Sequence, residues 1–93
     1  MITIQPQNKA YRLYMIECGD NSIYTGIALD VDKRFERHQK GKGSKYARSR
    51  LPLKLVFISP PIGGRGEAMK LEYRVKQLTH RQKLAIIDEN TIL

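Results

Sequence analysis

Five side chains of this sequence could together hydrolyse a phosphodiester. They are Tyr14, Tyr24, Arg34, His38 and Glu72. A tyrosine hydroxyl with its usual pKa of about 10 is a poor base at neutral pH, so it needs a nearby cation or proton acceptor. Arginine offers a planar fork of donors to a phosphate, and histidine can exchange a proton near pH 7. A single carboxylate can hold a magnesium ion that keeps several of its waters.

A β-hairpin is predicted to position the two tyrosines. Residues Tyr11–Glu17 are rich in strand-forming types, residues 19–21 (Gly-Asp-Asn) supply turn chemistry, and a second strand follows over 22–26. If the hairpin pairs Tyr14 and Tyr24 on one face, their hydroxyls can converge above the sheet.

A helix after the hairpin is predicted to carry the arginine and the histidine. Asp30 is a favourable N-cap, and the pattern predicts a helix from about Val31 to Gln39, which Gly41 and Gly43 end. Arg34 and His38 are four residues apart and therefore share one face of that helix.

The remaining pattern predicts a third strand over 53–59 and a helix over about 66–78, which carries Glu72. Thr79 and Gln82 form a capping-box pattern for one more helix. The resulting β-β-α-β-α-α order predicts an α+β domain with a three-stranded antiparallel sheet flanked by helices. We expect a short lead over 1–9, one domain over 10–87 and a tail over 88–93.

The positive charge is concentrated in one segment. Residues 33–54 contain nine Lys or Arg and one acid, Glu36, so this segment accounts for the whole net charge of +8. A nucleic acid is the natural partner of such a patch, although a solvated basic loop is the structural alternative. The candidate phosphate-binding residues are Lys33, Arg37, Lys40, Lys42, Lys45, Arg48, Arg50 and, less strongly, Lys76.

Composition limits the class of protein. A chain of 93 residues can bury one core, and no apolar run approaches the roughly 20 residues of a membrane-spanning helix. The first ten residues lack the basic start and apolar stretch of a secretory signal, so a cytoplasmic location is expected.

Each candidate also has a structural explanation when taken alone. Tyrosine is common in strands, Gly26 can serve a backbone that needs room, and Glu72 with Lys76 can form an ordinary i,i+4 ion pair. The joint set argues against coincidence.

The order and spacing resemble the GIY-YIG nuclease domain. Leu13-Tyr14 and Tyr24-Thr25-Gly26 stand where its two tyrosine motifs would be, and Arg34, His38 and Glu72 fall at matching places. The first motif here is Arg12-Leu13-Tyr14, without the Gly and Ile of the family name, and Thr25 replaces the second Ile. The similarity spans about 10–87, and the stretches 30–31, 41–43 and 72–78 extend it to the small stand-alone, YhbQ-like branch.

This resemblance implies a DNA endonuclease with one divalent ion, Mg²⁺ or Mn²⁺, held by Glu72. A water activated by Tyr14 or Tyr24 would attack the phosphorus; both remain possible bases, and Tyr14 is slightly favoured. Arg34 would stabilise the negative charge on the phosphate, and His38 would draw a proton from the tyrosine. We expect DNA rather than RNA, a monomer or weak dimer, and a possible need for a partner protein that supplies specificity. The alternative is a non-catalytic nucleic-acid-binding module that uses residues 33–54.

Overall fold

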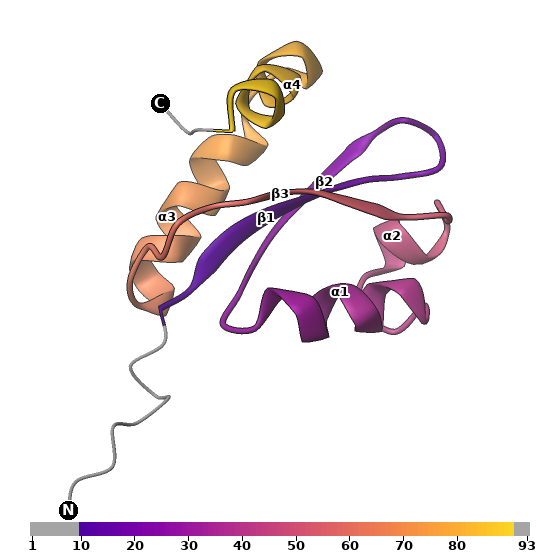
Figure 1. Cartoon of the computed structure of the whole chain (residues 1–93), viewed down its shortest axis with the longest axis horizontal. Coiled ribbons are helices and arrows are strands. Elements are labelled where there is room, and N and C mark those ends of the chain that lie inside the picture. The colour runs from indigo at the N-terminus through magenta and orange to yellow at the C-terminus, as the bar shows by residue number, and fades with distance from the viewer. Residues whose placement is uncertain (1–9, 91–93) are drawn as a thin grey trace, which may run out of the picture.

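The computed structural model describes residues 10–90, so the expectations for residues 1–9 and for the last three residues of the tail lie outside it. It confirms a single α+β domain. Figure 1 shows a central sheet with α1 and α2 on one side and α3 and α4 on the other. The elements are β1 (Arg12–Glu17), β2 (Ile23–Ala28), α1 (Val31–Gln39), α2 (Lys45–Arg48), β3 (Lys54–Ile58), α3 (Arg65–Lys76) and α4 (His80–Glu89).

The predicted hairpin is present, and its register puts both tyrosines on one face. The sheet is antiparallel with strand order β2-β1-β3. Tyr14 pairs with Gly26 and Ile16 pairs with Tyr24, so the two tyrosines lie diagonally across two neighbouring strands. Because side chains alternate between faces along a strand, Leu13 and Met15 point to the opposite side.

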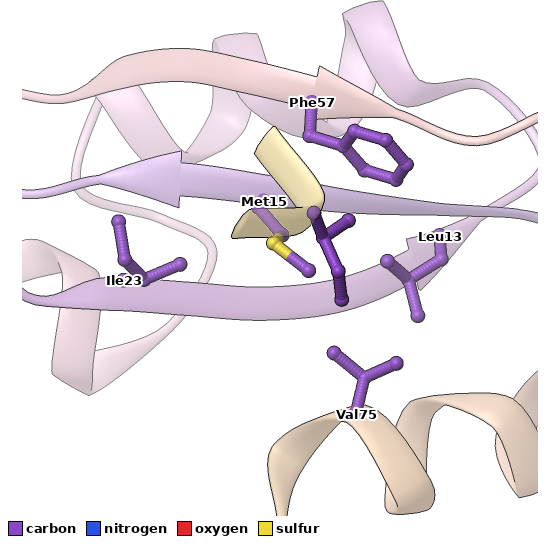
Figure 2. Close-up of a cluster of buried hydrophobic side chains, with 6 residues drawn as sticks. Leu13, Met15, Ile23, Phe57 and Val75 are labelled. Carbon is purple, nitrogen blue, oxygen red and sulfur yellow. The ribbon is translucent and has the colours of Figure 1, made fainter. Parts of the chain in front are cut away.

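That opposite side holds the larger apolar core, in which strand residues pack against α3 and α4. Figure 2 shows its side chains between the sheet and Val75 of α3. The buried members are Leu13, Met15, Ile23, Phe57, Val75 and Ile86. This cluster attaches α3 to the sheet and thereby fixes the helix that carries Glu72.

The other face of the sheet holds a second cluster beneath α1. Tyr14, Ile16, Cys18, Ala28 and Val31 are buried in it. The buried candidate residues of the hairpin and of α1, Tyr14 and His38, lie on this side. The sheet therefore separates them from the larger core.

Strand β3 contributes to both clusters because its pairing with β1 is irregular. Met15 pairs with Phe57, but the next residue, Ile16, pairs with Leu55, so Val56 is extra. This bulge reverses the alternation, and Leu55 faces the second cluster while Phe57 enters the first. The nearly continuous apolar run of this strand is therefore used on both faces.

The predicted helix caps form as expected. The Asp30 side chain accepts a hydrogen bond from Lys33 N at 3.1 Å at the start of α1. At the start of α4, Thr79 and Gln82 form the reciprocal capping box, with distances of 2.8 and 3.1 Å. Within residues 10–90, no helix is long and apolar enough to cross a membrane.

The predicted element order lacked one helix. The four-residue helix α2 lies inside the basic segment, so the observed order is β-β-α-α-β-α-α. Its N-cap is Ser44, whose Oγ accepts from Ala47 N at 3.3 Å. A single turn is too short to show helical periodicity, and only this capping residue marked it in the sequence. Helix α4 also extends through Asp88 and Glu89, where we had expected the tail.

Candidate active site

A buried tyrosine–histidine pair forms the centre of the site. Tyr14 and His38 are each only 1% exposed, and the Tyr14 hydroxyl lies 2.9 Å from His38 Nε2. We assign the neutral tautomer with its proton on Nδ1, so that the phenol donates and Nε2 accepts. The interaction joins the middle of β1 to the last turn of α1.

Burial keeps both partners neutral at rest. Desolvation raises the pKa of the Tyr14 hydroxyl far above its usual value, and the nearby Tyr24 raises it further. Burial also lowers the pKa of His38, with the positive charges of Arg34 and Arg37 acting in the same direction. Tyr14 is therefore a phenol at neutral pH and His38 is an uncharged imidazole that is available as an acceptor.

Arg34 and Glu72 both act electrostatically on the Tyr14 hydroxyl, although they come from different helices. The Arg34 charge lowers the pKa of Tyr14 and the Glu72 charge raises it. Arg34 is exposed on α1, whereas the Glu72 side chain on α3 is 21% exposed. The fold thus brings together all five residues that the sequence singled out.

Two glycines allow the pair to form by close approach. A Cβ on Gly26 would lie 2.6 Å from Cζ of Tyr14, so a side chain there would displace the phenol. A Cβ on Gly43 would lie 2.6 Å from Cε1 of His38 and would also collide with Nδ1. Gly43 was interpreted from the sequence as a helix stop; its contact with the imidazole depends on how the loop folds back, which no local pattern predicts.

An aromatic cluster surrounds Tyr24 and includes Tyr46, which the sequence did not single out. The Tyr24 ring lies edge-on to His38 at 5.2 Å between centroids, and Tyr46 of α2 lies 5.9 Å from Tyr24. The Arg50 guanidinium then covers the Tyr46 ring at 3.8 Å and bonds Asp20 of the hairpin turn at 2.9 Å. Tyr46 could not be identified earlier because α2, which carries it, was not predicted.

The donor set fits a weakly held divalent cation rather than a closed metal centre. Residues 10–90 contain no group of three or more His, Cys, Asp or Glu side chains that could hold a metal. Within residues 10–90, Glu72 is the carboxylate that acts on the Tyr14 hydroxyl, and its Oε2 already contacts a cation, Lys76 Nζ, at 3.3 Å. Such a site suits an ion that takes its remaining ligands from water and a substrate phosphate, as Mg²⁺ does.

Most of the proposed phosphate-binding residues are exposed on the surface of α1, α2 and the loop between them. Lys33, Arg37, Lys42, Lys45 and Arg48 are exposed. Lys40 is exposed too and pairs with Glu36 at 3.7 Å, while Lys76 pairs with Glu72. Arg50 differs from the rest because its guanidinium is occupied by Asp20 and Tyr46, which makes it part of the framework.

Comparison with known proteins identifies the family of this chain. The family model described as the GIY-YIG catalytic domain matches residues 10–85. The chain therefore belongs to the GIY-YIG family, which is a family of nucleases.

The named relatives belong to a small subgroup. A UPF0213 protein from Cronobacter sakazakii is 55% identical over 75 residues, covering 81% of this chain and 78% of that protein. The UPF0213 protein YhbQ of Escherichia coli K12 is 52% identical over 77 residues, covering 83% and 76%. A solution NMR structure of a UPF0213 protein from Bacillus halodurans is 42% identical, with coverage of 84% and 82% and a TM-score of 0.48.

Two of the three departures from the family motif, Leu13 and Thr25, point away from the site. Leu13 lies in the larger core, on the face opposite Tyr14. Thr25 alternates with Tyr24 and Gly26 along β2, is 2% exposed, and its Oγ1 has no hydrogen-bond partner among residues 10–90. Both substitutions therefore affect packing beneath α3 and leave the tyrosine face unchanged.

Proposed function

We propose that this protein is a metal-dependent endonuclease that hydrolyses phosphodiester bonds in DNA. The observation that carries the proposal is the buried hydrogen bond between the Tyr14 hydroxyl and His38 Nε2, on which the charges of Arg34 and Glu72 converge. Gly26 and Gly43 leave the room that this pair occupies.

Proton transfer would begin at this pair. The Tyr14 hydroxyl donates its proton to Nε2 of neutral His38. The resulting phenolate oxygen accepts a proton from the attacking water. Arg34 assists because its positive charge lowers the pKa of Tyr14 and offsets part of the effect of burial. Tyr14 is the better candidate base because it bonds His38 directly, whereas Tyr24 touches the imidazole through its ring edge.

The phosphate would be held by residues around the pair. Arg34 offers its exposed guanidinium to the nonbridging oxygens, where charge develops during attack. Glu72 would hold one Mg²⁺ or Mn²⁺, which when bound polarises the phosphate as a Lewis acid. Lys76 would have to release Glu72 for this, and its ammonium can then pair with the phosphate backbone.

A cleavage assay tests the proposal. Labelled single-stranded, duplex and branched DNA would be incubated with Mg²⁺ or EDTA and either the native protein, Tyr14→Phe or Glu72→Gln. We expect metal-dependent cuts, reduced about 10²- to 10⁴-fold in Tyr14→Phe, the range for loss of a general base. Glu36→Gln is the matched control for Glu72→Gln, because it also breaks an i,i+4 pair with a lysine, and it should still cleave.

A negative result would favour the binding-module alternative, which the exposed basic residues support. A protein that binds these DNAs but cuts none under varied metals and pH would contradict the nuclease proposal. In that case Glu72→Gln should leave affinity unchanged, and neutralising Lys42, Lys45 and Arg48 should reduce it along with the salt dependence.

A further inference from the structure

The outer face of α3 carries an exposed aromatic ring beside two basic side chains. A shallow, open hollow there is lined by Met69, Lys70, Tyr73 and Arg74. Tyr73 is 67% exposed and Met69 is 48% exposed, the highest values among the exposed tyrosines and the methionines of the described region. This surface lies outside the catalytic set and outside the basic segment 33–54.

The hollow begins beside the catalytic carboxylate. Successive residues of an α-helix are rotated by about 100°, so Tyr73 lies one step around α3 from Glu72, and Met69 lies between them on the helix surface. Val75 and Ala68, which are buried against the sheet, lie on the other side of Glu72. Glu72 therefore stands at the border between the buried face of α3 and this exposed stripe.

The charges around Tyr73 suit a polyanion. Both acids of α3 have partners within the helix region: Glu67 accepts from Gly64 N at 2.8 Å and Glu72 pairs with Lys76. Among residues 10–90, Lys70 and Arg74 form no ion pair, so the rim of the hollow is positive. A second copy of this chain would bring the same positive charges to the interface and be repelled.

We propose that this stripe is a subsite for an unpaired nucleotide of the DNA strand, next to the phosphate held at Glu72. Its base would stack on Tyr73 with Met69 alongside, and Lys70 and Arg74 would bind the flanking phosphates. A ring on the protein surface can stack only on a base whose face is free, so the substrate class is DNA with a single-stranded stretch at the cut. The location beside Glu72 rests on the proposed nuclease function; the stacking itself does not.

Binding in EDTA tests the subsite separately from cleavage. Fluorescence anisotropy would measure the affinity of a labelled single-stranded oligonucleotide for the native protein, Tyr73→Ala and Tyr73→Phe. Loss of one stacking contact should weaken binding of the alanine variant about 10- to 100-fold, while phenylalanine retains the affinity. Leu84→Ala removes an apolar side chain that is 38% exposed on α4 and is the matched control, expected to bind normally.

Two further readouts distinguish the occupant. Lys70→Ala and Arg74→Ala should each reduce the slope of log affinity against log salt by about 0.7, the value for one phosphate contact on a single strand. An oligonucleotide containing 5-iodouracil should crosslink on irradiation to a peptide that contains Tyr73.

Unchanged affinity in Tyr73→Ala would overturn the subsite, as would a dimer of the native protein that this substitution dissociates. If Tyr73→Ala still cleaves DNA and binds the oligonucleotide with unchanged affinity, the subsite alone is overturned. Binding that depends on Tyr73 without any cleavage would overturn the nuclease proposal alone.

Discussion

The two faces of the sheet are built from alternate residues of the same strands, yet one face is apolar and the other holds polar groups. The face toward α3 and α4 is filled by aliphatic side chains and Phe57 (Figure 2). The face toward α1 buries Tyr14 and His38, joined by a hydrogen bond, with glycines at the points of closest approach. One face therefore supplies stability through apolar area, and the other holds polar groups in a fixed arrangement.

This separation explains how so small a domain can bury the tyrosine–histidine pair. Leu13 and Tyr14 are adjacent in β1, and both are fully or almost fully buried, but their side chains meet different helices. The mutual hydrogen bond and the packing on the reverse side of the strand offset part of the cost of keeping a phenol and an imidazole out of water. His38 Nδ1 stays buried without a hydrogen-bond partner among residues 10–90. The comparison predicts that substitutions on the two faces will affect different quantities.

The largest effect on stability is expected on the apolar face. Leu13→Ala should lower the free energy of unfolding by about 2–5 kcal/mol. The Leu13 side chain is 0% exposed, so its truncation leaves a cavity in the core. Leu13→Met, which conserves volume, should cost less than about 1.5 kcal/mol. Urea denaturation measures both. Cleavage per folded molecule should stay near native, and a large rate loss in folded Leu13→Met would show that the faces are not independent.

A smaller stability change with a larger effect on rate is expected at Gly43. An alanine Cβ would collide with the His38 imidazole, so Gly43→Ala should displace the proton acceptor, cost about 1–3 kcal/mol and reduce cleavage markedly. Gly66→Ala is the matched control, because nothing lies within 4 Å of the added Cβ and alanine favours a helix. Equal cleavage rates for the two variants would contradict the role assigned to Gly43.

The sequence could predict elements whose signals are local. The hairpin, both capped helices and the shared face of Arg34 and His38 follow from turn residues, N-caps and helical spacing, and the structure confirms them. The pairing of Tyr14 with His38 was only a possibility, because the distance between a strand and a helix depends on tertiary packing. The bulge at Val56, the short helix α2 and the contacts of Tyr46 and Gly43 have no periodic signature.

The smallest effect should be on the pH dependence of the free energy of unfolding, and it arises from His38 on the polar face. Burial lowers the pKa of His38 in the folded protein, so the unfolded chain takes up a proton first as the pH falls below about 6.5. Stability should therefore decrease on acidification through that pH and approach its lower limit below the folded pKa, by on the order of 1 kcal/mol between pH 7 and 5. His38→Gln should flatten this part of the urea-denaturation profile. Because the proposed relay needs neutral His38, cleavage by the native protein should fall at a lower pH than the onset of the stability loss, where folded His38 itself takes up a proton. A rate that rose on acidification would mean that the imidazole does not act as the proton acceptor.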